Sequence, residues 1–99
     1  MIFAYESFAG TTESNQMGIP QDTQTIAVQI TDTASGTTVS LKLQGSITLD
    51  GTMVDLIPEG AKDAEMKAEG IYRFDGRGLS VVQIYGNTAN LKVEAVAAG

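Results

Sequence analysis

The chain has 99 residues, a net charge of −6, and neither cysteine nor histidine. This length is near the commonest domain size, so we expect one domain spanning residues 1–99. The acidic balance, with only six scattered basic residues, argues against duplex nucleic acid or an anionic membrane as a partner, since both require a basic face. No apolar run is long enough to cross a membrane, and the N-terminus lacks the pattern of a signal peptide. Synthesis in a cytoplasm is therefore expected.

Residues 1–23 are predicted to form an N-terminal strand or arm and a long loop, ahead of a sandwich body at 24–99. Three of the six aromatic residues fall within residues 2–8, and both faces of a strand there would be partly apolar. Such a strand is either an ordinary core strand or an arm that packs on a neighbouring subunit. Residues 10–23 are polar, and a loop of that length is often functional. The candidate subunit or capsid interface consists of Phe3, Tyr5, Phe8, Met17 and Ile19.

The middle of the chain carries the clearest strand patterns. Apolar and polar residues alternate over 26–31, and odd positions are apolar from Val39 to Leu49 with the exception of Gly45. That period of two predicts strands with one face in a core, and a glycine inside such a strand usually marks a bulge or bend. The pattern places Ile47 and Leu49 on the core face. Asp50-Gly51 is predicted to turn the chain into a return strand.

The last part of the chain predicts a connection and then three strands. Residues 61–69 contain good helix formers but only one large apolar residue, so we expect a polar connection with at most one helical turn or a short edge strand. Alternation over 71–75, apolar residues over 79–85 and alternation over 91–95 predict the final strands. About eight short strands joined by turns indicate an all-β fold, an antiparallel β-sandwich of jelly-roll-like type.

Without histidine or cysteine, the chain cannot form the common catalytic triads or the ordinary zinc and copper sites. Carboxylates remain, and a glycosidase would need two of them facing each other across a cleft. Turn or surface positions explain these residues better, so no catalytic, cofactor or metal residue is predicted, although Asp50 and Asp55 would meet at a calcium site if the fold brought them together. The carboxylates considered are Asp50, Asp55, Asp63, Glu65 and Asp75.

Three aromatic residues in the second half have two interpretations. Tyr72, Phe74 and Tyr85 would suit a platform for stacking sugars, because aromatic faces bind sugar rings. Alternation places Tyr72 and Phe74 on one face of a strand, where packing in the core accounts for them equally well and is favoured.

Two segments carry a resemblance to a known class of protein. LQGSITLDGTMVDL (43–56) is similar to a strand–turn–strand pattern, and GIYRFDGRGLSVVQIYGNTANLKVEAVAAG (70–99) is similar to the block that commonly follows it. Together they resemble small β-sandwich domains of tailed-bacteriophage virion proteins, as in head fibres, capsid decoration proteins and tail adhesins. The match departs from the pattern at Met53, where an aromatic residue is usual, and at Ile47-Thr48, which resemble an insertion.

The resemblance implies a non-enzymatic structural protein located in the virion, assembling as a homo-oligomer, most often a homotrimer, on a capsid or tail surface. A major capsid protein or another virion protein would be its partner. The alternative is a carbohydrate- or receptor-binding module of a phage tail or fibre that recognises a host-surface glycan, with Tyr72 and Tyr85 as its best candidates.

Overall fold

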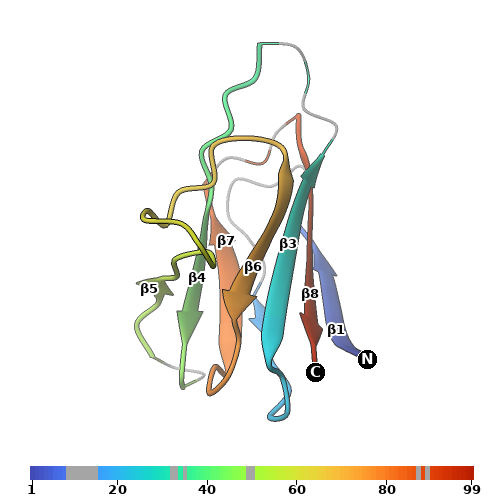
Figure 1. Cartoon of the computed structure of the whole chain (residues 1–99), viewed down its shortest axis with the longest axis vertical. Helices are drawn as coiled ribbons and strands as arrows, with labels where there is room; N and C mark the ends of the chain where they lie inside the picture. The colour runs from blue at the N-terminus through green and yellow to red at the C-terminus, as the bar shows by residue number, and fades with distance from the viewer. Residues whose placement is uncertain (9–15, 32–33, 35, 49–50, 87, 89) are drawn as a thin grey trace.

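Two four-stranded antiparallel sheets face each other in the computed structural model, which describes residues 1–8, 16–31, 34, 36–48, 51–86, 88 and 90–99 (Figure 1). The first sheet contains, in spatial order, β1 (Ile2–Ser7), β8 (Lys92–Ala98), β3 (Thr25–Thr31) and β6 (Gly70–Asp75). The second sheet contains β2 (Met17–Gly18), β7 (Val81–Tyr85), β4 (Lys42–Ser46) and β5 (Val54–Asp55). The predicted all-β sandwich is confirmed. Across the described residues, no helix is long and apolar enough to cross a membrane.

The strand pairs are nested around the middle of the chain. β1 pairs with β8, β2 with β7, β3 with β6, and β4 with β5, all antiparallel. The chain therefore folds back on itself as one long hairpin, and its successive pairs lie alternately in the first and the second sheet. β8 and β7 each acquire a second neighbour, β3 and β4 respectively.

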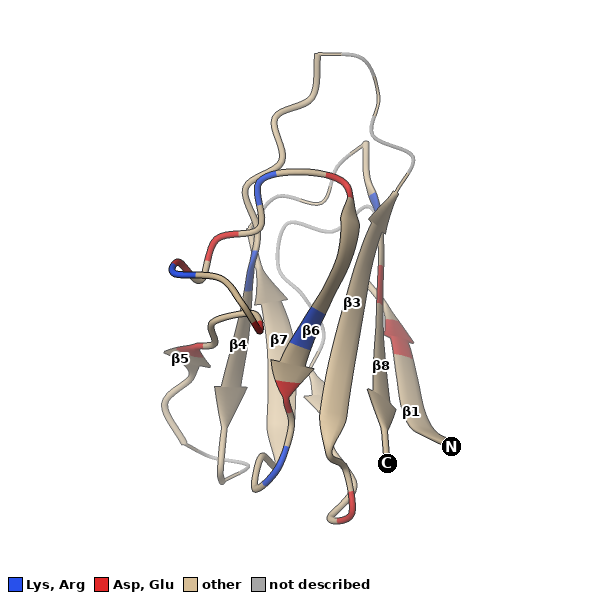
Figure 2. Ribbon diagram, in the orientation of Figure 1, with Lys and Arg blue, Asp and Glu red and all other residues tan. Residues whose placement is uncertain are grey.

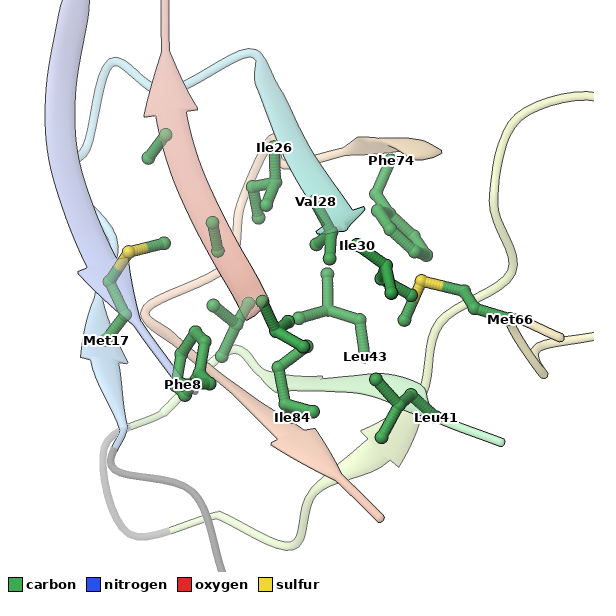
Figure 3. Close-up of a cluster of buried hydrophobic side chains, with 14 of the residues drawn as sticks. Phe8, Met17, Ile26, Val28, Ile30, Leu41, Leu43, Met66, Phe74 and Ile84 are labelled. Atoms are coloured by element: carbon green, nitrogen blue, oxygen red, sulfur yellow. The ribbon is translucent and has the colours of Figure 1, made fainter. Parts of the chain in front are cut away.

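The core lies between the inner faces of the two sheets (Figure 3). Burial along β3 alternates residue by residue, as the sequence pattern predicts, and its inward side chains are completely buried. Alternation arises because successive side chains of a strand point to opposite faces. The largest fully buried side chains are Phe8, Ile26, Val28, Ile30, Leu41, Leu43, Met66, Phe74, Val82, Ile84, Val93 and Thr88.

The N-terminal residues are part of the sandwich. β1 is an edge strand of the first sheet, and the chain continues into Phe8, whose amide donates a hydrogen bond to the carbonyl of Val93. Residues 16–23 are not simply a loop, because Met17 pairs with Val82 and begins the two-residue strand β2. Pairing over two residues leaves no periodicity in the sequence, which is why the loop prediction missed β2. Residues 9–15 of the predicted loop lie outside the described residues.

The strand predicted from 39 to 49 is shorter than its pattern. β4 ends at Ser46, and the side chain of Ile47 is 74% exposed, so the prediction that Ile47 faces the core is wrong. Leu49 and Asp50 lie outside the described residues. Gly45 does not mark a bulge either, because its pairing with Val82 continues the regular register of β4 and β7.

Close packing explains why a glycine occupies position 45. A Cβ atom at this position would lie 3.0 Å from Leu56 Cδ1 and 3.3 Å from two methyl carbons of Leu79. These two leucines occupy the space beside the glycine and pack against the core.

Residues 61–69 form a connection without a helix, in agreement with the sequence prediction. Met66 is completely buried and forms an isolated antiparallel bridge with Leu41. Two backbone hydrogen bonds link them, from the Met66 amide to Leu41 and from the Leu41 amide to Met66, at 2.7 and 3.1 Å. The buried side chain of Met66 therefore anchors the connection to the core of the sandwich.

Candidate functional site

The outer face of the first sheet carries an exposed surface that we call the Tyr5 face. It forms a shallow depression of about 240 Å³ that spans all four strands. Tyr5 and Ile71 are 56% and 54% exposed and lie at opposite edges, whereas the two central strands contribute Ala27 and Val96 in one row and Gln29 and Glu94 in the next. The lining residues are Tyr5, Ala27, Gln29, Ile71, Arg73, Glu94 and Val96.

The strand register fixes how these residues are arranged. Tyr5 pairs with Val96, Val96 with Ala27, and Ala27 with Arg73, which gives one row across the sheet. In the adjacent row Ser7 pairs with Glu94, Glu94 with Gln29, and Gln29 with Ile71. Side chains in one row point to the same face because paired residues of neighbouring strands share their orientation.

The charged side chains of the Tyr5 face come from β6 and β8. Figure 2 shows a basic and an acidic segment on each of β6 and β8, which contain Arg73 and Asp75, and Lys92 and Glu94, respectively. The hydroxyl of Tyr5 donates a hydrogen bond to Glu94 Oε2, and this bond raises the pKa of Tyr5 above its usual value. Lys92 Nζ lies 3.8 Å from Glu94 Oε1. Among the residues that line the depression, Tyr5 and Glu94 therefore lie toward β1 and β8, and Arg73 lies on β6.

The predicted interface residues divide into two groups. Phe3 and Tyr5 are exposed, at 36% and 56%, and for them a role in an interface stays a prediction. Phe8, Met17 and Ile19 are buried in the core of their own chain, which accounts for their apolar character without a partner. Sequence reasoning missed Arg73, Glu94 and the small residues between them, because only the long-range pairing of four strands brings them onto one face.

The outer face of the second sheet carries a polar row. Gln83 Nε2 donates to Gln44 Oε1 at 3.1 Å, and Gln44 Nε2 donates to Asp55 Oδ1 at 2.8 Å. Lys42 Nζ lies 3.3 Å from Asp55 Oδ2. Lys42 also pairs across the sheet with Tyr85 of β7, which is 62% exposed. These hydrogen bonds, foremost the one from Gln44, lower the pKa of Asp55.

Three of the candidate carboxylates gather beside that row. Asp55, Asp63 and Glu65 line an open depression of about 440 Å³ together with Lys42 and Lys67. The hydrogen bond from the Ser40 hydroxyl lowers the pKa of Glu65. A general acid for glycoside hydrolysis needs a raised pKa. The pKa values of Asp55 and Glu65 are lowered instead, which is the opposite of what this role requires.

The other two candidate carboxylates lie elsewhere. Asp75 accepts hydrogen bonds from Arg77 in the turn after β6. Asp50 lies outside the described residues, and so does the calcium site that it would share with Asp55. Among the residues that the structure describes, no group of three or more acidic, histidine or cysteine side chains is arranged to hold a metal ion.

The three aromatic residues considered for sugar stacking do not form one platform. Phe74 is completely buried, and Tyr72 packs against the core while its hydroxyl donates a 2.7 Å hydrogen bond to the carbonyl of Ala68. Tyr85 is exposed on the second sheet. The core interpretation agrees with the complete burial of Phe74 and the partial burial of Tyr72, and of the three rings only that of Tyr85 is mostly exposed.

These features define a small antiparallel β-sandwich with a partly apolar depression on one outer face and a row of polar side chains on the other. No protein-family model matches the chain, and no curated protein matches it. Among solved structures, the chain is similar to the SPBc2 prophage-derived protein YomS, with a TM-score of 0.69 and 16% sequence identity. The similarity covers 96% of this chain and 93% of YomS. At this identity the comparison establishes a shared fold.

Proposed function

We propose that this chain is a non-enzymatic structural protein of a bacteriophage virion, of the capsid decoration or head-fibre type, which assembles as a homo-oligomer on the particle surface. The observation that carries the proposal is the nested pairing of eight strands in two sheets. We interpret this pairing as a jelly roll, an architecture of viral capsid and lectin domains. The inference from fold to function is by analogy.

Two further observations support the proposal. The segments 43–56 and 70–99 resemble β-sandwich domains of phage virion proteins, and the solved structure with the same fold comes from a prophage-derived protein. The exposed Tyr5 face offers a surface for contact between copies or with a capsid protein, since large exposed apolar side chains on a sheet favour association. The resemblance implies three copies per assembly.

Particle composition tests this function. Particles of the phage that encodes the chain would be purified on a density gradient and analysed by quantitative mass spectrometry. We expect the chain to sediment with the particles in a fixed ratio to the major capsid protein. Its absence from intact particles that contain all other structural proteins would contradict the proposal. A soluble protein from the same lysate provides the control for contamination.

One observation favours carbohydrate binding as a second candidate. The exposed ring of Tyr85 lies beside Lys42 and next to the row formed by Gln83, Gln44 and Asp55. An aromatic face flanked by planar polar groups can stack on a sugar ring and hydrogen-bond its hydroxyls. If this candidate holds, Tyr85→Ala abolishes binding to a bacterial surface glycan, whereas Tyr5→Ala, on the other sheet, leaves it unchanged. Equal binding by the Tyr85→Ala variant would exclude this surface.

A further inference from the structure

The Tyr5 face is arranged so that it complements itself. Tyr5 and Arg73 lie in the same row but at opposite edges of the first sheet, separated by Val96 and Ala27. Three strand spacings place their backbones about 14 Å apart. Tyr5 and Glu94 therefore lie on one side of the line between β8 and β3, and Arg73 lies on the other side.

A two-fold axis along that line, lying in the plane of the contact, exchanges β1 with β6 and β8 with β3. This rotation places Arg73 of a second copy over Tyr5 of the first and beside its Glu94. It also places Val96 of each copy over Ala27 of the other. Symmetry repeats each contact, as in any isologous interface. Two twisted sheets packed face to face in this way keep their strands within about 30° of each other.

The chemistry of the face fits this arrangement. A guanidinium over a tyrosine ring is attracted by the ring's quadrupole. Tyr5 already donates a hydrogen bond to Glu94, so the same guanidinium would reach a carboxylate next to the ring and form a charge-assisted hydrogen bond. In the described part of the chain, none of the four ion pairs includes Arg73. At the centre of the contact, Val96 lies over Ala27, and the same rotation places Glu94 over Gln29 of the second copy.

We infer that a second copy of this chain docks on the Tyr5 face through two symmetric Arg73–Tyr5/Glu94 contacts. This inference rests on the proposed function for the setting in which copies meet, and it names the surface that joins them. Its two-fold symmetry departs from the three copies that the resemblance implies, and the oligomeric state measured below distinguishes the two. Two strands of six residues and two of seven cover roughly 400 Å² in projection, compared with about 800 Å² of accessible surface per partner in a standard interface. We therefore expect a weak dimer that forms with increasing concentration.

Charge reversal and mixing test the contact. In an Arg73→Glu variant both contacts of the dimer bring two carboxylates together, and in a Glu94→Arg variant both bring two guanidinium groups together. Each variant alone is expected to dimerise at least about tenfold more weakly in sedimentation equilibrium. An equimolar mixture of the two variants restores both complementary contacts, so a one-to-one heterodimer is expected. Lys62→Glu makes the same change of charge in the 61–69 connection and serves as the matched control.

The outcomes separate this inference from the proposed function. Native mass spectrometry of the mixture reports heterodimers directly, and circular dichroism verifies that both variants retain the wild-type fold. A wild-type chain that stays monomeric at high concentration, a trimer, or a dimer unaffected by Arg73→Glu would each overturn the Tyr5-face contact. None of these results bears on whether the chain is present in purified particles, which is measured independently.

Discussion

The turn after β6 shows how single residues fix local charge. Arg77 donates from its backbone amide and from Nε to Asp75 Oδ1 at 3.0 Å, and from a terminal nitrogen to Oδ2 at 2.8 Å. Chiefly because of the side-chain hydrogen bonds, the pKa of Asp75 is lowered to about 2. Both side chains are largely exposed, at 55% and 74%, so solvent screens their pairing and its effect on global stability is small.

Arg77→Ala is expected to raise the pKa of Asp75 from about 2 toward its ordinary value of 3.8. Because the folded-state pKa is lowered, the pairing stabilises the fold above the ordinary pKa, and this stabilisation is lost as the pH falls toward 2. Titration of the Asp75 carboxyl carbon by NMR measures the shift. Lys62→Ala removes one positive charge elsewhere, and an equal shift in that variant would mean that the turn geometry is not the cause.

A second prediction at this scale concerns Gly86, which follows β7. Its φ is +127°, and a Cβ atom there would lie 2.6 Å from the carbonyl oxygen of Ser40. Gly60 also has a positive φ, of +78°, but has open space around it. Gly86→Ala should therefore lower the free energy of unfolding by about 1–3 kcal/mol more than Gly60→Ala, because only Gly86 adds overpacking to backbone strain. Urea denaturation of both variants measures the difference, and equal losses would contradict the close contact.

At the scale of elements, Met66 holds the connection between β5 and β6. Its side chain is fully buried, and its backbone pairs with Leu41. The sequence predicted the connection correctly, but a lone methionine among charged residues shows no periodicity, so its place in the core could not be read from the sequence.

Met66→Ala is expected to lower the free energy of unfolding by about 2–5 kcal/mol through lost burial and a residual cavity. Ile47→Ala is the control, because Ile47 is 74% exposed and surface substitutions usually change stability by no more than about 0.5 kcal/mol. Thermal or urea unfolding gives both values. A larger loss of stability for Ile47→Ala than for Met66→Ala would show that β4 continues beyond Ser46 and that Ile47 faces the core, as the alternating sequence pattern predicts.

Local patterns thus predicted the elements better than the surfaces. Alternation placed β3, β6 and β8 because one face of each is buried, and period-two burial leaves a direct trace in the sequence. β2 left no such trace, and the alternation through Ile47 continued past the end of the strand. The Tyr5 face depends on which strands become neighbours, so the sequence indicated Tyr5 as an interface candidate but not Arg73 and Glu94, which lie on the same face.

At the scale of the whole molecule, the sandwich measures 39 × 26 × 25 Å and presents different chemistry on its two outer faces. One face combines exposed apolar side chains with charged residues on β6 and β8, and the other carries a hydrogen-bonded row of polar side chains. A building block of a particle needs one surface for its neighbours and can expose the other to solvent. The proposal of a virion role assigns the Tyr5 face to the first task and the Tyr85 side to the second.

Cryo-electron microscopy of purified particles tests that role most directly. Reconstructions would be compared between wild-type phage and a phage from which the coding sequence of this chain has been deleted. The account predicts symmetric surface density in the wild type that fits the 39 × 26 × 25 Å sandwich and is missing from the deletion particles. Two indistinguishable reconstructions, from particles that both assemble fully, would contradict it.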